Sequence, residues 1–378
     1  MNKSKIPNRK SQVMKNYLNN KYISFTLLVL SFTLLMQPAL ADTSAIDLGY
    51  IGAGARPIAM GKAYTAVADD VNAVFINPAG LGQQKNWGLT SMTTKLLDRV
   101  EYKMVGGVMP TEFGTVGIGY LSAATPAGYL TTDRSSVVGA PSISYGSTMM
   151  ILSYGRNLGE AISNSGDLAK VSMGANVKMI SNNFQGTDGG ATGTSMDLGV
   201  IYKANENVSG GVSLQNVGGA VNWNNGTSEK LPLTAKIGGA LNQQKISAAA
   251  DLDLGSGATL LHGGVEFRPY DVLALRAGID QSRLSQTETI TNMTYGVGVK
   301  MQGFSFDYAY RQDASLASNS ASYFSISFSP VIKKAAVAEK EEVKDANAQA
   351  IASQSAGPDG VYHIVKKVQA KDILKYYE

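Results

Sequence analysis

The stretch Phe304–Arg311, FSFDYAYR, decides the fold class because its side chains alternate strictly between two kinds. Aromatic residues occupy the even positions, whereas the odd positions hold small or charged residues such as Asp307 and Arg311. Successive side chains of a β-strand point to opposite faces of the sheet, so this period of two predicts a strand with one apolar and one polar face.

The same alternation recurs through the region between Trp87 and Pro330. We expect fourteen strands, near residues 87–94, 100–110, 113–122, 147–156, 169–181, 193–203, 208–217, 231–242, 244–253, 260–268, 272–280, 292–302, 303–311 and 321–330. Tight turns are expected at 110–114, 204–207, 242–244, 268–271 and 302–303, and long polar loops at 123–146, 182–192, 218–230, 281–291 and 312–320. Short turns on one rim and long loops on the other are typical of bacterial outer-membrane barrels.

A soluble β-sandwich would also alternate, but its polar face would be solvated and rich in charge. Here only 16% of the residues are charged, and the polar faces are mostly Ser, Gly, Ala and Thr. We therefore predict an all-β fold: a transmembrane antiparallel β-barrel of about fourteen strands over residues 86–330. On this basis Val297→Arg should block membrane assembly, whereas Gly298→Ser should be tolerated.

The first 41 residues read as a secretory signal peptide. Six basic residues precede the apolar run Ile23–Met36, and the small-residue site Ala39-Leu40-Ala41 predicts cleavage before Asp42. A membrane anchor is the alternative, but a spanning helix needs roughly 20 apolar residues. Loss of six positive charges from the formal +4 leaves −2, so the basic balance gives no argument for a nucleic-acid partner.

Residues 42–85 are rich in small residues and predict a helical plug inside the barrel. ARPIAMGKAYTAVADD looks helical, with Pro57 in its first turn, and a second helix is expected from Val71 to Ile76 with Asp70 as its N-cap. Asn77-Pro78-Ala79 is either a turn that stops this helix or a hinge of the plug.

Residues 331–378 form a third region, which we expect to be a periplasmic tail. Lys333 to Ala352 reads as a solvated helix or linker, and Val361 to Glu378 as a short strand followed by an amphipathic helix. The end of the tail faintly resembles the opening of a LysM peptidoglycan-binding module. A terminal helix without a ligand is the favoured interpretation.

The segment Gly54–Gly82 resembles the N-terminal plug of PorV/PorQ-type proteins within the FadL-like barrel superfamily. The matching residues are Ala55, Arg56, Met60, Gly61, Ala68, Asp69, Asp70, Asn77, Pro78, Ala79, Gly80 and Leu81. The resemblance implies a fourteen-stranded barrel with the N-terminal segment in its lumen. Lys62, where the family often has a small residue, and the long tail are departures from the family pattern.

Catalysis has little support in the sequence. The chain has no cysteine and only two histidines, of which His262 is expected to be a hydrogen-bonding lumen residue, and no cofactor or metal site is predicted. Charges of both signs are expected to point into the lumen. They are Asp197, Lys203, Lys236, Asp251, Asp253, Glu266, Arg268, Arg276, Lys300, Asp307 and Arg311. An ion-pair network that braces strands and plug, joined by Arg56, is favoured over a substrate pathway.

Two functions remain open, and neither is enzymatic. The first is passive transport of small hydrophobic molecules across an outer membrane of the Gram-negative type, through a pocket near Met60, Tyr64 and Phe75. The second is a PorV-like role in protein secretion or surface attachment, with partner sites in loops 123–146 and 218–230 around Tyr129 and Trp223. A secreted soluble enzyme is a distant third hypothesis.

Overall fold

The computed structural model describes residues 47–126, 128–129, 142–161, 166–185, 189–255, 258–285 and 288–330. Its strands are β1 Gly88–Leu96, β2 Val100–Thr111, β3 Gly114–Ala124, β4 Gly128–Tyr129, β5 Ser142–Asn157, β6 Val171–Gln185, β7 Gly190–Lys203, β8 Val208–Trp223, β9 Ser228–Lys230, β10 Thr234–Asn242, β11 Ile246–Gly255, β12 Ala258–Tyr270, β13 Leu273–Arg283, β14 Thr289–Met301, β15 Phe304–Gln312 and β16 Ala321–Phe328. Its helices are η1 Leu48–Ile51, α2 Ala55–Ala59, α3 Ala73–Ile76, η2 Pro78–Gln83, α4 Leu158–Ala161, η3 Gly166–Lys170 and η4 Ala317–Asn319. The predicted signal peptide, the start of the plug before Asp47 and the predicted tail lie outside the described residues.

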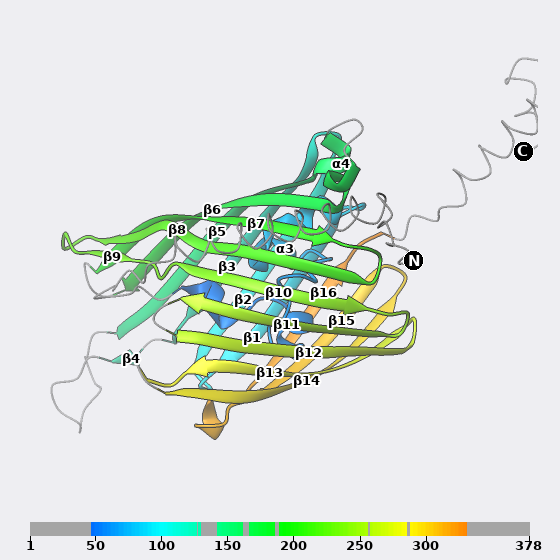
Figure 1. The fold of residues 1–378 in the computed structure, drawn as a ribbon. Coiled ribbons are helices and arrows are strands. Elements are labelled where there is room, and N and C mark those ends of the chain that lie inside the picture. Colours follow the sequence, from blue (N-terminus) through cyan, green and yellow to red (C-terminus); the bar gives the residue numbers. More distant parts are fainter. Residues whose placement is uncertain are drawn as a thin grey trace, which may run out of the picture. The chain divides into compact units, whose positions relative to one another are not determined.

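The strands form a closed antiparallel barrel (Figure 1). Each of the fourteen barrel strands pairs with its neighbours along the chain, and β1 pairs with β16 so that Leu89 lies opposite Phe328. β4 and β9 are short additions that pair with β5 and β8, while β8 continues the barrel by pairing with β10. Closure pairs every wall strand on both sides, while β4 and β9 each have one neighbour among the described strands. The predicted fold class is confirmed, with fourteen strands in the wall.

Burial in this barrel is inverted relative to a soluble protein. Glu266 is 1% exposed and Asp280 is 0% exposed on the inner face, whereas Leu241 is 58% and Ile326 is 54% exposed on the outer face. Soluble proteins almost never bury acidic residues unless they are paired, and they rarely expose large continuous apolar surfaces. The outer surface is therefore matched to an apolar medium and the inner surface to polar contacts.

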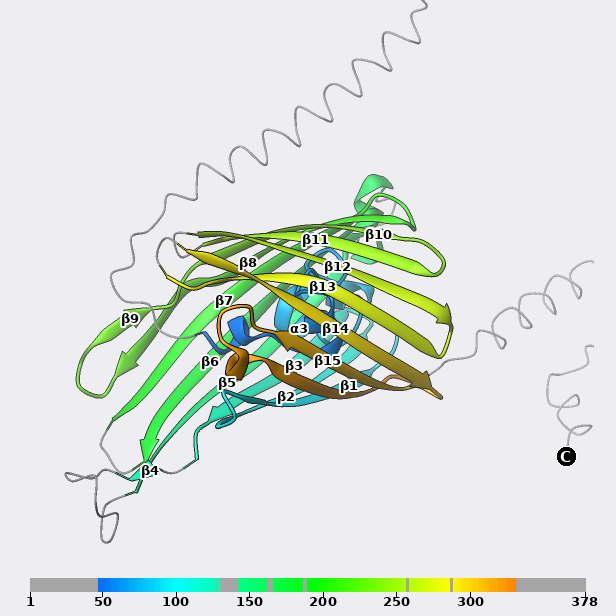
Figure 2. The same ribbon diagram turned by 90° about the horizontal axis from the view of Figure 1, so that it is seen from below.

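Of the predicted long loops, 312–320 agrees with the break between β15 and β16, whereas strands continue into parts of 182–192, 218–230 and 281–291. β6 ends at Gln185 and β7 begins at Gly190, so most of 182–192 is a hairpin, and β8 extends through Trp223 into the range 218–230. β5 to β8 therefore project further at one end of the barrel than the strands opposite them (Figure 2). In these ends small and polar residues such as Asn182, Asn183 and Gly219 follow one another, which removes the apolar alternation on which the prediction depended.

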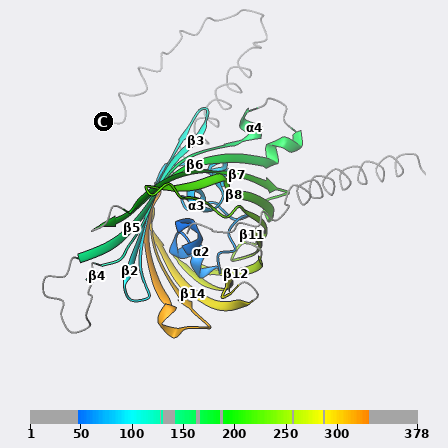
Figure 3. The same cartoon turned by 90° about the vertical axis from the view of Figure 1, so that its left-hand side faces the viewer.

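The plug lies inside the ring of strands, where α2 and α3 are enclosed (Figure 3). It is less helical than expected: α2 ends at Ala59, because Gly61 and Lys62 both have positive φ, at 62° and 65°. The next helix begins at Ala73 rather than at Val71, and the Asp70 carboxylate accepts the Asn72 N–H at 2.9 Å just before it. Compact turns therefore replace the longer helix that we expected.

No helix in the described part of the chain is long and apolar enough to cross a membrane.

Candidate functional site between plug and barrel

A cavity of about 340 Å³, here called cavity A, lies between the plug and the barrel wall. Phe75 and Ile76 of the plug and Leu260 of β12 give it an apolar lining. The cavity lies toward the rim opposite the tight turns, because its lining includes Gly255 and Ala258. These residues end β11 and begin β12 at that rim. The other lining residues are Asp47, Gly49, Tyr50, Gly52, Ala53, Lys62, Gln215, Pro232, Thr234, Lys236, Asp253, His262 and Arg283. Concave, mostly apolar spaces of this size with a few polar groups are typical of small-molecule sites.

One side of cavity A is polar. The Lys236 ammonium lies 2.5 Å from Asp253 Oδ2, and His262 Nε2 lies 3.4 Å from the same oxygen. The other ring nitrogen of His262 lies 3.1 Å from the carbonyl oxygen of Gly61. Since a carbonyl oxygen can only accept, Nδ1 carries the proton that joins the wall to the plug.

Lys62 ties the first turn of the plug to the wall beside cavity A. Its ammonium donates to the Tyr50 carbonyl oxygen at 3.2 Å and lies 5.2 Å from the centre of the Tyr50 ring. It is also 3.6 Å from Asp280 Oδ2, which accepts the Arg311 Nε–H at 2.6 Å. Burial lowers the pKa of the Lys62 ammonium, and the charge of Asp280 opposes this only in part.

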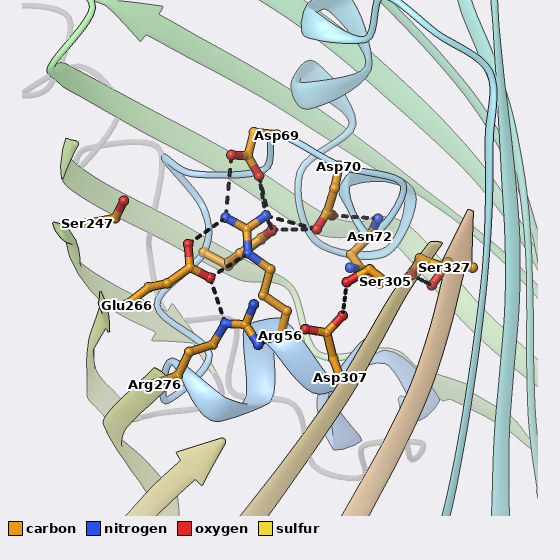
Figure 4. A network of polar contacts seen from close by, with 12 residues as sticks. Arg56, Asp69, Asp70, Asn72, Ser247, Glu266, Arg276, Ser305, Asp307 and Ser327 are labelled. Carbon is orange, nitrogen blue, oxygen red and sulfur yellow. Dashed lines mark hydrogen bonds and ion pairs between the residues drawn. The ribbon is translucent and has the colours of Figure 1, made fainter. Parts of the chain in front are cut away.

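A second group of charges surrounds Arg56, and we call it the Arg56 cluster (Figure 4). Arg56 Nη1 lies 2.6 Å from Asp69 Oδ1 and 3.0 Å from Asp70 Oδ2, both in the plug. Arg56 Nε donates to Glu266 Oε2 of β12 at 3.0 Å. The Tyr64 hydroxyl lies between the two aspartates, at 2.8 Å from Asp70 Oδ2. The cluster thus joins plug to wall, and Asp69 and Asp70 pair within the plug rather than with a barrel arginine.

Glu266 is the centre of this cluster. Its side chain is 2% exposed and is bonded by Arg56, by Arg276 Nε at 2.6 Å and by Arg268 at 2.9 Å. Arg276 in turn reaches Asp307 of β15 at 2.7 Å. Glu266 therefore balances several guanidinium groups from two strands and the plug.

The protonation states of the plug residues follow from these contacts. Burial disfavours the charged form of Arg56, but Asp69, Tyr64 and Glu266 outweigh burial and hold its pKa well above the ordinary value. Burial likewise acts to raise the pKa of Asp69, yet the charge and hydrogen bond of Arg56 hold it below the ordinary value. Arg56 and Asp69 are therefore a fully ionised pair at neutral pH.

A second cavity of about 290 Å³, cavity B, lies at the tight-turn rim beside the Arg56 cluster. Val272, Gly303 and Ser329, which lie in or next to the turns of that rim, contribute to its lining. It is lined by charges of both signs, including Asp271 and Lys300. Lys300, one of the predicted lumen charges, lies exposed here, and its ammonium has no ion-pair partner among the described residues.

The structure argues against our expectation that Gly298→Ser is tolerated, because the added atoms would displace the paired ends of Asp307 and Arg276. A Cβ at Gly298 would overlap Asp307 Oδ1 and lie under 3 Å from both terminal nitrogens of Arg276. We predict that Gly298→Ser lowers the free energy of unfolding by about 1–3 kcal/mol, as overpacked sites do. Gly239→Ser is the control, because no atom lies within 4 Å of its added Cβ. Equal urea midpoints for the two variants in detergent would contradict the prediction.

Polar side chains of the barrel satisfy the backbone of the plug. Asp251 Oδ2 accepts the N–H groups of Tyr64 and Thr65, both at 2.8 Å. Thr294 donates to the Ala59 carbonyl oxygen, and Ser325 accepts the Ala55 N–H. Buried backbone groups without partners are costly, so these contacts allow an irregular segment to fill the lumen.

The predicted plug-motif residues occupy this interface. Asn77 accepts the Ala79 N–H at 3.1 Å, capping η2, and donates to the Thr65 carbonyl oxygen at 2.8 Å. Pro78 is the first residue of η2, and Ala79 and Gly80 are buried in it. These contacts fit the turn interpretation, and the hinge interpretation stays a prediction.

Gly61 marks the closest approach of plug and wall. Its φ is 62°, and an added Cβ would overlap the carbonyl oxygens of Ile279 and Gly263. Gly61→Ala should therefore weaken plug docking beyond the about 1–2 kcal/mol that the left-handed conformation costs an L-residue. Gly218→Ala is the matched control, since Gly218 has φ 64° but no atom within 4 Å. Limited proteolysis of the plug should be faster in Gly61→Ala than in Gly218→Ala, and equal rates would refute the close approach.

A third charged group lies where the β7–β8 ladder is interrupted. Asp197 is 2% exposed and lies 2.8 Å from the Lys178 ammonium. Asp197 Oδ1 also accepts the backbone N–H of Asn216, a residue with φ 64° in the irregular part of β8. The pair thus fills a gap in strand pairing.

The prediction for the pocket residues was partly wrong. Phe75 lines cavity A, but Met60 and Tyr64 are completely buried and line neither cavity. Tyr64 is held by its hydroxyl contacts to Arg56 and Asp70, and Met60 packs against the wall at Gly264 and Gly278. Alternation cannot show which plug side chains face a void, because the plug has no regular period.

Sequence reasoning missed two charged residues of the lumen. Asp280 pairs with Arg311, and Lys178 pairs with Asp197. Both could have been found from alternation alone: Asp280 shares the polar face of β13 with Arg276, and Lys178 lies between Val177 and Met179 in β6. Lys203, in contrast, is exposed at the end of β7. Among the described residues no group of three or more His, Asp and Glu side chains is arranged to hold a metal ion.

Three solved structures with a similar fold are described as a hydrocarbon channel or a toluene transporter. CymD, a monoaromatic hydrocarbon channel, matches with a TM-score of 0.53 at 14% identity, over 76% of this chain and 99% of that chain. The toluene transporter TbuX of Ralstonia pickettii matches with 0.51 at 16% identity, over 75% and 99%. The toluene transporter TodX of P. putida matches with 0.51 at 15% identity, over 76% and 99%. At such identities the likeness establishes the fold alone.

The shared fold agrees with the fourteen-stranded barrel that the resemblance of the plug motif implied. None of the three is described as a PorV or PorQ protein, so the narrower resemblance stays a prediction. No family model matches the sequence, and no curated protein matches it.

Proposed function

We propose that this chain is an outer-membrane barrel that lets small hydrophobic molecules pass through its lumen, with cavity A as the binding site. The observation that carries the proposal is cavity A itself, an apolar space of about 340 Å³ between plug and wall, near the rim opposite the tight turns. The fold shared with CymD, TbuX and TodX, which are described as hydrocarbon channels or toluene transporters, supports it.

The two rims of the barrel indicate how it is oriented in the membrane. The tight-turn rim, where β1 begins and β16 ends, faces the periplasm, as in bacterial barrels with short periplasmic turns. Residues 1–41 are then an export signal and residues 331–378 a periplasmic tail. In this proposal the plug moves to let a molecule pass, since Met60 and Gly61 pack directly against β12 and β13.

The test is uptake of radiolabelled toluene by cells whose lipopolysaccharide-containing outer membrane carries the protein. Ala258→Phe places a ring in cavity A, whereas the control Ala250→Phe adds the same ring at an exposed position of β11. We expect uptake to rise with the wild type and with Ala250→Phe, and to return to background with Ala258→Phe. Equal uptake by both variants, or no uptake above background by the wild type, would refute the proposal.

The position of Trp223 gives little support to a role in secretion or surface attachment. Trp223 lies at the end of β8, where its ring is 6.1 Å from that of Phe184 and packs against the buried core. A side chain held in this way offers little surface to a partner protein. Tyr129 lies in β4, and the neighbouring residues 130–141 lie outside the described part of the chain.

A further inference from the structure

Two buried polar atoms beside cavity A lack a hydrogen-bond partner among the residues that the structure describes, and a hydrocarbon cannot supply one. Asp253 is 4% exposed and lines the cavity, and its Oδ1 atom has no hydrogen-bond partner among the described residues. His262 is 2% exposed, also lines the cavity, and its Nε2 atom likewise lacks a hydrogen bond within the described part of the chain. Buried polar atoms are normally paired, so two orphan atoms beside one cavity point to a ligand group that pairs them.

The missing partner is a hydrogen-bond donor. Asp253 Oδ1 belongs to a carboxylate that already pairs through Oδ2 with Lys236, so Oδ1 can only accept. The cations of the lining are engaged: Lys236 with Asp253 at 2.5 Å, Lys62 with the Tyr50 carbonyl oxygen at 3.2 Å, and Arg283 with the Ser285 carbonyl oxygen at 3.0 Å. A ligand carboxylate would bring no donor for Asp253 Oδ1.

We propose that cavity A takes small neutral molecules with an apolar body and one hydroxyl group, which donates to the Asp253 carboxylate. The hydroxyl has a single proton, which goes to Asp253 Oδ1, and its oxygen can accept from His262 Nε2–H when the ring is protonated at both nitrogens. The apolar body lies against Tyr50, Phe75 and Leu260, which also line the cavity. This inference rests on the proposed function and names its substrate class.

A polar group in the site changes selectivity more than an extra apolar contact does. Sites that hydrogen-bond a ligand hydroxyl discriminate strongly against the analogue without it, because the polar groups of the site are then left unpaired. 4-Methylphenol and toluene differ by one hydroxyl, and a phenol is neutral at pH 7. They are therefore a suitable pair of probes, with 4-methylbenzoate as the anionic probe.

The test measures binding of these three probes to the full chain in detergent by isothermal titration calorimetry. The variant is Lys236→Met with Asp253→Leu, which removes both charges of the pair, so that neither remains buried without a partner. Lys178→Met with Asp197→Leu is the matched control, because it removes a buried pair that does not line cavity A. Heat-modifiable migration on a gel shows whether each variant contains a folded barrel.

We expect the wild type and the control to bind 4-methylphenol at least tenfold more tightly than toluene, about 1.4 kcal/mol. In the Lys236→Met, Asp253→Leu variant, toluene should bind as tightly as 4-methylphenol or more tightly. Each probe also partitions into the detergent, but to the same extent with every variant. The ratio of 4-methylphenol to toluene affinity can therefore be compared between variants.

Three outcomes overturn the inference. An unchanged ratio in the cavity variant means that Asp253 does not receive the hydroxyl, and equal binding of toluene and 4-methylphenol to the wild type means that water satisfies the orphan atoms. Tightest binding of 4-methylbenzoate would make cavity A an anion site. In each of these cases the proposed function still holds if the wild type takes up toluene and Ala258→Phe does not. If no probe binds and no toluene is taken up, both the inference and the proposed function are refuted.

Discussion

Val297→Arg should leave almost no folded barrel in the membrane. Val297 lies in β14 on the outer face, 37% exposed, opposite Leu275 of β13 and Tyr308 of β15. An arginine on the lipid face of a barrel costs about 2–4 kcal/mol near the middle of the bilayer. Native proteins are stable by only about 5–15 kcal/mol, so a loss of this size during insertion is decisive.

The measurement is the fraction of protein that shows heat-modifiable migration after extraction from outer membranes. Met301→Arg is the control, because Met301 lies on the same face of the same strand but at its end, where it is 61% exposed. The cost of a charge falls to about 0–1 kcal/mol near the interface, so Met301→Arg should assemble. Equal assembly of the two variants would show that the outer face of β14 does not contact lipid.

Glu266→Gln should destabilise the folded protein on the order of 3–5 kcal/mol, the range found when one partner of a buried ion pair is removed. The substitution keeps the shape of the side chain but removes the negative charge that Arg56 and Arg276 share. Both guanidinium groups are largely buried, with side-chain exposures of 15% and 5%. They would then lie close to each other without the carboxylate that separates them.

Urea unfolding in detergent, followed by the fluorescence of Trp87 and Trp223, measures this loss. Glu101→Gln is the control, since Glu101 pairs with Lys103 at the surface, where both side chains are more than half exposed. Exposed pairs of this kind contribute about 0–1 kcal/mol. If the two variants unfold within 1 kcal/mol of each other, the Arg56 cluster does not hold the plug in the barrel.

Prediction from the sequence was most successful where regular geometry leaves a regular signal. All fourteen wall strands were predicted within a few residues at most ends, because lipid outside and polar groups inside force a period of two on every strand. The same alternation placed Asp251, Glu266 and Arg276 on the inner face, where each is at most 8% exposed. The projecting ends of β6 and β8 were missed because small and polar residues follow one another there, as in Ser181-Asn182-Asn183 and Gly218-Gly219, and give no apolar alternation.

The candidate site was less predictable, because it is made by contacts between distant parts of the chain. Arg56 and Glu266 are separated by 210 residues, and Tyr64 and Asp251 by 187. Composition could indicate a small-residue plug and an inner face with charges of both signs. It could not indicate that Phe75 faces a cavity whereas Met60 and Tyr64 are packed.

The sequence alone therefore determined the class of fold, the number of strands and the face on which each side chain lies, since these follow from a local rule that repeats every two residues. Only the tertiary structure decided which charges pair, where the plug touches the wall and where space remains. Those features depend on the register between strands and on the path of an irregular segment through the lumen. A Cβ at Gly61 or a hydrogen bond to Asp253 Oδ1 has meaning only once these are known.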